Sequence, residues 1–431
     1  MTSFIRKIIK AFKDPALPEN YFRLEIYNLR AFGLEMLKEE SWLYTIYSRI
    51  TLLFLVYSFT AGESLEVYLN WGGLNALVDV VSYLFTHIGG AVKVTLLFYN
   101  RKKFGAMIRK FHAIPFAPNP TRGGNVEAEF IRKVIKITDI QFGVYMTFVS
   151  ATLFIGGIRC SWSILFKTRN EWVVPFSPIT ILKHAGSPYF ELGSLYQYVC
   201  VTLFAVIIVT VDVLLCCIMA QLSVQFKILR NAFEYIPLTI INNVINLNYF
   251  RNMRNRAKEM ANIGPNPKNE EECMRIILGE YIHHHCAVFQ LAAELEDLIN
   301  VIVLGATGVD TILLCFLLYQ CARYPIGSVT FLQNFFYYWI IVTQVSMYCY
   351  WGNEITSEAE ELATAAGNVN WPGTSLSVPR GLVLVIARSQ KPLFMTIGKF
   401  FPLSLTTLMS LLKGSFSYFT VMRQTNNMEQ E

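Results

Sequence analysis

The chain has 431 residues, of which 53% are hydrophobic, 14% are aromatic and only 16% are charged. An average soluble domain carries about 25% charged residues, so this composition excludes an ordinary soluble protein and indicates one that crosses a membrane several times. The formal net charge of +6 fits an uneven distribution of cations across a membrane, and it gives no reason to expect nucleic-acid binding.

Seven stretches of the chain approach the ~20 consecutive apolar residues that an α-helix needs to cross a bilayer. They cover residues 43–62, 75–98, 137–158, 196–221, 299–320, 327–350 and 394–423. The sequence therefore predicts an all-α membrane protein with seven transmembrane helices.

The distribution of Lys and Arg between the spans predicts the orientation. Residues 1–42, 99–136, 223–297 and 352–392 together hold 27 of them, whereas the segments on the opposite side hold six. Lys and Arg accumulate in cytoplasmic loops, so the N-terminus is expected in the cytosol. An odd number of spans then places the C-terminus outside the cell.

The predicted helices extend beyond the membrane. Span four continues to about Phe233, span six continues through residues 352–361, and residues 381–387 form a short apolar helix before span seven. These extensions predict a cytosolic layer of helices that pack together and between subunits. The predicted organisation is a cytosolic segment 1–42, spans one to four 43–222, a cytosolic helical segment 223–298, spans five and six 299–350, cytosolic anchor helices 351–392, the membrane half of span seven 393–423 and an extracellular tail 424–431.

The longest predicted exterior segment, residues 159–195, is rich in aromatic residues and proline. Such a loop can pack back onto the bundle as a lid, or its aromatic residues can form the belt that is found at membrane interfaces. The sequence leaves both interpretations open.

Charged residues within the spans are informative, because each costs a few kcal/mol unless it faces protein or water. The candidates are Arg49, Asp79, Lys93, Asp212, Asp310, Lys399 and Lys413. Several lie near span ends, where a long side chain can reach the interface. Lys413 lies near the middle of span seven, so we expect it either to pair with an acid of a neighbouring span or to face a hydrated vestibule.

Span seven carries mostly small and hydroxyl-bearing residues at steps of three and four, which places them on one face of a helix. They are Leu403, Thr407, Ser410, Gly414, Ser417, Val421 and Gln424. In a membrane, such a face indicates close helix contact or a water-filled lumen.

The outer halves of spans two, three, four and six carry aromatic and hydroxyl side chains that are expected to line a common pocket. The candidate ligand-binding residues are Tyr83, Phe85, His87, Thr147, Ser150, Phe154, Tyr198, Thr202, Phe335 and Tyr338. An apolar pocket with a few hydroxyl groups suits a small volatile or lipophilic ligand. The alternative is that these residues are the ordinary aromatic content of a membrane bundle.

The sequence contains no phosphate-binding loop, no His-Glu-x-x-His and no Gly-x-Ser-x-Gly motif, so an enzyme is not expected. His283, His284 and His285 project in three directions from a helix and are not expected to share a metal ion. No cofactor is predicted. A bridge between Cys160 and Cys200 is conceivable on the predicted topology, but free thiols are favoured.

The C-terminal eighty residues carry motifs that closely resemble the signature of insect odorant receptors. The matching segments are Tyr350-Trp351-Gly352-Asn353-Glu354, Arg388-Ser389-Gln390-Lys391-Pro392, Gly398-Lys399-Phe400-Phe401-Pro402-Leu403-Ser404-Leu405 and Ser415-Phe416-Ser417-Tyr418-Phe419-Thr420-Val421. The preceding residues are similar to that family only in span count, topology and the arrangement of cytosolic helices.

The resemblance implies an odorant-gated, non-selective cation channel of the plasma membrane, in the dendrite of an olfactory sensory neuron. It implies a tetramer with a shared co-receptor, in which span seven lines the pore. The chain lacks the long cytosolic insertion of the co-receptor and so resembles an odorant-binding tuning subunit. The positions that match the narrowest part of the pore are Val421, Gln424 and Thr425, and Ser417 and Lys413 are further candidates for the pore wall. The co-receptor has an apolar residue at the position of Thr425, which implies a weaker seal here or one supplied by the partners.

Two other receptor classes remain as alternatives. Gustatory receptors share the fold and a terminal motif to which Ser417-Tyr418 and Gln424-Thr425 are similar but altered at both ends. A G-protein-coupled receptor would have an exterior N-terminus, which the distribution of Lys and Arg opposes. A transporter would more often show paired inverted repeats, and none is evident.

Overall fold

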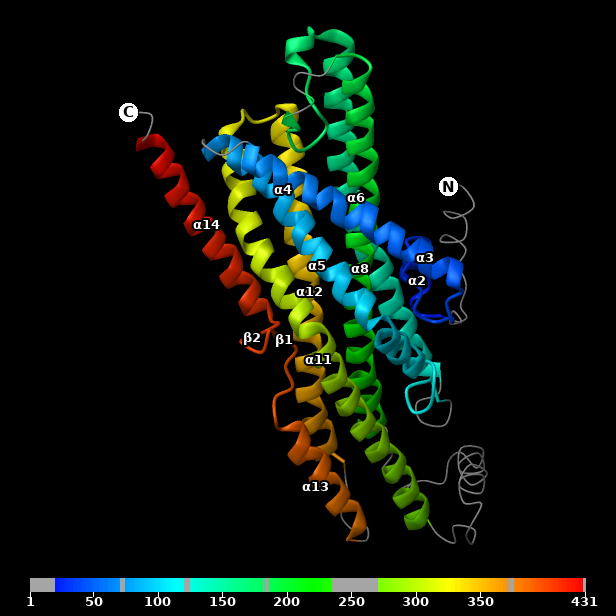
Figure 1. Cartoon of the computed structure of the whole chain (residues 1–431). Helices are drawn as coiled ribbons and strands as arrows, with labels where there is room; N and C mark the ends of the chain where they lie inside the picture. Colours follow the sequence, from blue (N-terminus) through cyan, green and yellow to red (C-terminus); the bar gives the residue numbers. More distant parts are fainter. Residues whose placement is uncertain are drawn as a thin grey trace.

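The computed structural model describes residues 20–69, 74–119, 125–180, 182, 186–234, 270–369, 371 and 376–428, with all their side chains except those of 74–77, 125, 270–274, 276 and 425–428. Long helices run side by side and form an elongated bundle (Figure 1). Within the described ranges, strands occur only in one two-stranded antiparallel hairpin.

The chain enters the bundle through α2 (Arg23–Ala31) and a rod made of α3 (Trp42–Thr51), a π-helical segment (Leu52–Ser58) and α4 (Phe59–Leu69). The long helices are α5 (Leu74–Phe111), α6 (Asn125–Phe166), α8 (Tyr189–Glu234), α11 (Glu270–Arg323) and α12 (Val329–Gly367), and a 3-10 turn (Arg169–Glu171) lies between α6 and α8. The last described elements are α13 (Ser377–Ser389), β1 (Thr396–Ile397), β2 (Phe401–Pro402) and α14 (Leu405–Met428).

Five of the described helical segments are long and apolar enough to cross a membrane. They are Trp42–Leu69, Val78–Phe111, Val126–Phe166, Tyr189–Glu234 and Ile277–Arg323. They coincide with the predicted spans one to five. The predicted spans six and seven fall in α12 and mainly in α14, so the seven-span count and the orientation stay predictions.

Several helices are much longer than a bilayer is thick. With a rise of 1.5 Å per residue, the 46 residues of α8 and the 54 residues of α11 extend about 70 and 80 Å, against ~30 Å of hydrocarbon. The predicted helical extensions past spans four and six are confirmed, because α8 runs to Glu234 and α12 runs to Gly367. Of the predicted helical segment 223–298, residues 235–269 lie outside the described residues.

Helix α8 is the central column of the bundle. Every residue from Ile207 to Phe226 is buried, and α8 packs against α5, α6, α11 and α12. A helix that is apolar on all sides is typical of a protein core or a membrane span, and here the neighbouring helices cover the most hydrophobic candidate span on nearly all sides. Its neighbours present one face to α8 and leave the other exposed.

The prediction of a membrane helix from residue 394 is wrong for residues 394–404, because a β-hairpin occupies this segment. Gly398 and Lys399 have φ angles of +58° and +66°, which a helix does not allow. The hairpin is fixed to α11, since the Thr396 amide donates to Glu296 Oε2 at 2.9 Å and the Gly398 amide donates to the Asn300 carbonyl at 3.1 Å. The helix α14 therefore starts at Leu405.

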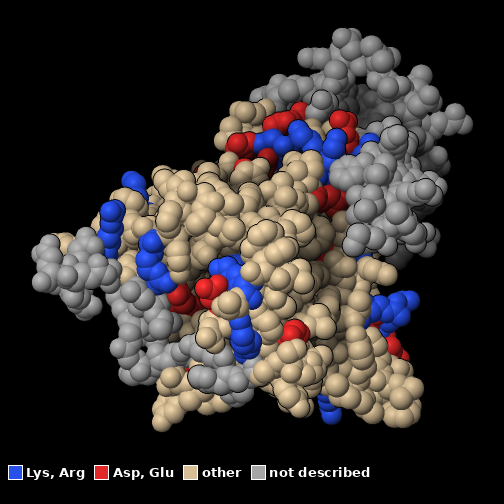
Figure 2. All heavy atoms as spheres, turned by 90° about the horizontal axis from the view of Figure 1, so that it is seen from above, with Lys and Arg blue, Asp and Glu red and all other residues tan. Residues whose placement is uncertain are grey.

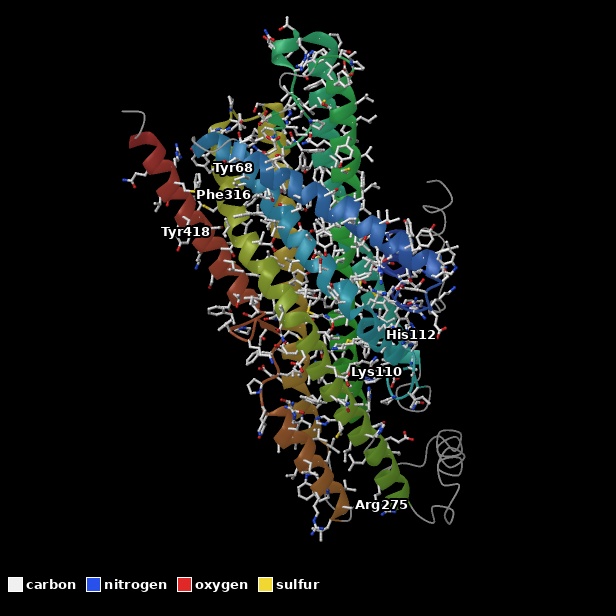
Figure 3. All side chains as sticks on the ribbon, viewed as in Figure 1. Tyr68, Lys110, His112, Arg275, Phe316 and Tyr418 are labelled. Atoms are coloured by element: carbon white, nitrogen blue, oxygen red, sulfur yellow. The ribbon has the colours of Figure 1, made fainter. Side chains whose placement is uncertain are left out.

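Helix α14 contacts α11 and α12 and then diverges from the bundle toward its C-terminal end (Figure 1). Tyr418 projects from α14 at a level near Phe316 of α11, while Lys110, His112 and Arg275 lie toward the opposite end of the molecule (Figure 3). Phe419 is buried against Cys315 and Tyr319, whereas Tyr418 is 68% exposed. One face of α14 is thus attached to this chain and the other is open.

Gly352 is required where α12 passes the start of α14. A Cβ atom at this position would lie 2.5 Å from Leu403 Cβ and 2.6 Å from the Leu403 carbonyl oxygen. We expect Gly352→Ala to lower the free energy of unfolding by about 1–3 kcal/mol, because the backbone of the hairpin must move away. Thermal unfolding of the purified protein measures the effect.

Gly308→Ala in α11 is the matched control, since nothing lies within 4 Å of the position that the added methyl group would take. This change should be neutral or slightly stabilising, because alanine favours the helix by up to about 1 kcal/mol over glycine. Equal melting temperatures for the two variants would contradict the close approach at Gly352.

Candidate functional site

A buried ion pair lies in the middle of the bundle. The Lys93 ammonium of α5 lies 2.7 and 2.9 Å from the two carboxylate oxygens of Asp212 on α8, and both side chains are almost completely buried. In an apolar bundle neither charge is tolerated alone, so each residue requires the other. Two of the intramembrane charges recognised in the sequence are therefore partners.

Four further side chains extend this pair into a network that joins five helices. The Tyr145 hydroxyl of α6 lies 3.2 Å from Asp212 Oδ2 and 2.9 Å from Gln344 Oε1, and its proton is shared between these acceptors. Tyr348 of α12 donates to Asp212 Oδ1 at 2.7 Å. Gln344 of α12 donates to Asp310 Oδ2 of α11 at 2.6 Å. Helices α5, α6, α8, α11 and α12 thus meet at one polar centre.

A small chamber lies directly against this network, and we call it the inner chamber. Its volume is about 80 Å³, and Tyr145 and Gln344 are its principal link to the buried charges. The lining is otherwise mainly apolar and consists of Tyr83, Thr86, His87, Val149, Thr152, Leu153, Phe176, Val201, Ala205, Ile208, Val209, Tyr337, Ile340 and Ile341. Apolar walls with a few hydrogen-bonding groups at one side are typical of a site for a small organic ligand.

His87 is held in place at the wall of the inner chamber. Its Nδ1 lies 2.6 Å from Glu63 Oε2 of α4, and its ring stacks on Phe204 with 5.0 Å between centroids. Phe59 also contacts the ring in an edge-to-face arrangement, with 5.2 Å between centroids. This fixed orientation makes the imidazole a defined polar group in the chamber wall.

A second, larger chamber lies nearer the end of the bundle that carries the loop between α6 and α8, and we call it the outer chamber. Its volume is about 310 Å³. It is lined by Asp79, Tyr83, Arg159, Trp172, Val173, Val174, Phe176, Pro178, Ile179, Phe190, Gln320, Tyr324, Thr330 and Asn334. Tyr83 and Phe176 belong to both chambers and form the wall between them.

The loop between α6 and α8 is packed into the bundle at this wall. Phe176 is buried, and its ring stacks on Tyr198 with 6.0 Å between centroids. Arg159 donates to the carbonyls of Val174 and Pro175, and Glu66 accepts from the amide and hydroxyl of Thr180.

This part of the loop packs on the bundle as a lid would. Trp162 and Tyr189 beside it are exposed, as the residues of an interfacial belt would be. Seen from this end, most of the described surface is uncharged (Figure 2).

The candidate ligand-binding residues fall into three groups. Tyr83 and His87 line the inner chamber, while Phe154 and Tyr198 line a separate groove of about 510 Å³ between the ends of α6 and α8. The others lie outside these spaces. Phe85 stacks on Phe316, Thr147 and Ser150 are exposed on α6, Thr202 donates to the Tyr198 carbonyl, and Phe335 and Tyr338 lie on α12 without lining either chamber.

Sequence reasoning missed four prominent residues of the inner chamber, namely Tyr145, Phe176, Tyr337 and Gln344. Phe176 could not be assigned, because it reaches the chamber from a loop. Gln344 and Tyr145 could have been found by asking which polar side chains lie at the depth of Lys93 and Asp212, since a buried carboxylate requires hydrogen-bond donors beyond its counter-ion.

The pore candidates lie on the open side of α14. Ser417 and Gln424 are exposed, Val421 is 58% exposed, and the side chain of Thr425 is outside the described set. Lys413 is also exposed, and no described carboxylate lies within 4 Å of it. Among the described side chains, Lys413 therefore has no acidic partner of the kind that one of the two predictions required.

The remaining candidates for special chemistry have ordinary partners. Cys160 and Cys200 are free thiols. His284 Nε2 lies 3.1 Å from Gln225 Oε1, and His285 Nε2 lies 3.2 Å from Ser389 Oγ, so these histidines serve different contacts. In the part of the chain that the structure describes, no group of three His, Cys, Asp or Glu side chains is arranged for a metal ion.

Comparison with known proteins identifies a family. Residues 73–416 match the model of the 7tm odorant receptor family. The chain is 21% identical to odorant receptor 82a of Drosophila melanogaster over 93% of this chain and 98% of that protein, and 21% identical to odorant receptor Or2 of Anopheles gambiae over 85% and 89%. Putative odorant receptor 92a of Drosophila melanogaster is 27% identical, but the match covers only 34% of this chain and 36% of that protein.

The fold is similar to that of a solved structure. The insect olfactory receptor OR5 from Machilis hrabei in complex with eugenol superimposes with a TM-score of 0.73 at 14% identity, over 94% of this chain and 98% of that chain. A second structure of the same receptor gives a TM-score of 0.70 at 15% identity. At this level of identity the similarity concerns the fold.

Removing one member of the buried ion pair should be far more damaging than removing both. Lys93→Met is expected to lower the free energy of unfolding by about 3–5 kcal/mol, because it leaves the Asp212 carboxylate without a counter-ion. The double variant Lys93→Met/Asp212→Asn should recover much of this loss. Thermal unfolding of the purified variants provides the comparison.

Lys413→Met on α14 is the control, and it should leave the melting temperature of the isolated chain nearly unchanged. A double variant whose loss equals the sum of the two single losses would show that the two side chains do not interact.

Proposed function

The chain belongs to the 7tm odorant receptor family, a family of receptors and not of enzymes, and from this premise we propose that it is the odorant-binding subunit of a ligand-gated, non-selective cation channel. A small volatile ligand binds in the inner chamber and opens a pore that is lined by α14. The subunit acts in a heterotetramer with the odorant co-receptor, in the plasma membrane of olfactory neurons. The observation that carries this proposal is the contact between the inner chamber and the buried network.

The size of the inner chamber supports a ligand-dependent change of shape. An apolar cavity of about 150 Å³ binds a molecule as small as benzene, whereas the inner chamber has about 80 Å³. A ligand must therefore move wall residues, of which Tyr83 and Phe176 are the ones that border a second open space. The ligand then binds the expanded state better than the compact one, and this difference in affinity can drive gating.

A continuous set of contacts connects the chamber with α14. Gln344 lines the chamber and donates to Asp310 of α11. Farther along α11, Glu296 and Asn300 bind the hairpin that precedes α14, and α12 touches the same hairpin where Gly352 meets Leu403. Displacement of α11 or α12 at the chamber would therefore reach the start of α14 through direct contacts.

The exposed surfaces of α13 and α14 support assembly with partner subunits. Val383 and Leu384 of α13 and Phe416 and Tyr418 of α14 are all more than half exposed. Because α13 lies in the predicted cytosolic layer, where lipid does not cover it, its exposed apolar side chains mark a contact surface. The open face of α14 also carries Ser417, Val421 and Gln424, with Thr425 and Lys413 on the same helix, as a pore wall requires. The match over residues 73–416 favours this function over the gustatory-receptor and G-protein-coupled alternatives.

Current through the proposed channel should depend on the partner. Expression of this chain alone in a heterologous cell is expected to give little odour-evoked current, and co-expression with the co-receptor should produce it. Whole-cell recording with a panel of volatile compounds measures the difference. Robust currents from the chain alone would remove the requirement for a partner.

A charge change in α14 links the co-expressed current to this subunit. Gln424→Arg should shift the reversal potential or lower the conductance, because it places a cation at the proposed pore wall. An unchanged current would show that only the partners line the pore.

Ligand preference should depend on the residues that line the inner chamber and less on aromatic residues elsewhere in the bundle. Tyr83→Ala is expected to shift the preference of the co-expressed channel toward longer members of a series of straight-chain alcohols, because it removes a shared wall of the chamber. Tyr338→Ala truncates the same kind of side chain outside the chamber and should change the ranking less. Equal effects of the two variants on half-maximal concentrations would contradict the assignment.

A further inference from the structure

We propose that the outer chamber is a second ligand site, which binds a small organic acid with an apolar body, and in which Arg159 receives the carboxylate. This site is distinct from the inner chamber, because Tyr83 and Phe176 stand between the two. Its volume of about 310 Å³ is almost four times that of the inner chamber. It can hold a benzoate-sized molecule without enlargement.

The charges around the outer chamber do not balance. The Asp79 carboxylate is already used, since Arg323 Nη2 lies 2.7 Å from Asp79 Oδ2 and also 2.7 Å from the Tyr324 hydroxyl. Arg159 has no such partner, because none of the described carboxylates lies within 4 Å of its guanidinium. Glu191 also leaves an oxygen unpaired, but it lines the separate groove between α6 and α8. Asp79 also attracts Arg159 at longer range, but it is the counter-ion of Arg323, so the three side chains together leave one positive charge in excess at the chamber.

The hydrogen bonds of Arg159 are incomplete as well. Its Nη2 donates to the Val174 carbonyl at 3.2 Å and to the Pro175 carbonyl at 3.1 Å, while its Nε is buried without an acceptor. A buried N–H without a partner costs about 1–3 kcal/mol. The planar guanidinium matches a carboxylate, which can accept two parallel hydrogen bonds from it. A modest turn of the side chain would present such a pair of donors to a bound acid.

The walls of the outer chamber fit the rest of an organic acid. Trp172, Phe190, Tyr83 and Phe176 offer aromatic surface, and Gln320, Thr330 and Asn334 add neutral polar groups. Arg169 stacks on Trp172 and Phe190, at 4.8 and 4.7 Å from the ring centroids, and so steadies this wall. One cation beside aromatic surface selects a single carboxylate on an apolar body in preference to a polyanion or a neutral hydrocarbon.

Binding to the purified full chain tests the proposal directly. In nanodiscs of phosphatidylcholine alone, where no anionic lipid competes, benzoate is compared with benzamide, its neutral counterpart of nearly the same shape. Calorimetric or ligand-detected NMR titration at pH 7.4 should show benzoate binding at least tenfold more tightly. Arg159→Met should reduce the affinity for benzoate to that for benzamide, and Arg159→Lys should give an intermediate value.

Two controls locate the site. Lys167→Met removes an exposed cation of the same loop outside the chamber and should leave benzoate binding unchanged. Ala205→Phe fills the inner chamber and should also leave it unchanged. Equal affinity of the wild-type protein for benzoate and benzamide would overturn the proposal. Loss of benzoate binding in a folded Ala205→Phe variant, or full benzoate binding in a folded Arg159→Met variant, would also overturn it. The wild-type comparison needs neither the variants nor channel activity, so its result is separate from that of the proposed function.

Discussion

The ion pair between Lys93 and Asp212 constrains the whole bundle. Each charge would cost several kcal/mol if it were left alone among apolar side chains, so α5 and α8 are held in one relative position. Tyr145 and Tyr348 use the remaining acceptor capacity of the same carboxylate and thereby fix α6 and α12. A rotation of any of these helices would leave a buried donor or acceptor unpaired, and the network therefore resists such a rotation.

This rigidity limits where the molecule can change shape. The two chambers lie between the network and the loop end of the bundle, and their shared wall contains Phe176, which is held by loop contacts and not by a helix. At the other side of the network, the hairpin fixes the start of α14 to α11, and one face of α14 packs along α11 and α12. In the proposed mechanism, a ligand would first move the wall at Phe176. The movement would then pass through the hydrogen-bonded network around Asp212 and reach α14, one face of which is exposed.

The sequence was sufficient to predict the long helices, because their apolar runs exceed the length of a bilayer crossing and leave few other possibilities. It was insufficient for residues 394–404, where apolar composition suggested a helix. The φ angles of Gly398 and Lys399 and the acceptor Glu296 decide the conformation there, and they depend on contacts with α11. Tyr83, His87, Phe154 and Tyr338 were all predicted to line one pocket, but only Tyr83 and His87 line the inner chamber. Helix rotation is set by packing that the periodicity of one sequence does not specify.

The network stabilises the bundle, whereas the loop shapes the chambers, and this difference affects which substitutions such a receptor tolerates. Substitutions at Tyr145 or Gln344 disturb hydrogen bonds on which the whole bundle depends, so they lower the free energy of unfolding. Substitutions at Phe176 or its neighbours alter the dividing wall between two cavities while the helices stay in place. On the proposed function, a substitution in the segment from Trp172 to Ile179 therefore changes the shape of the ligand chambers without a change in the helices around the network.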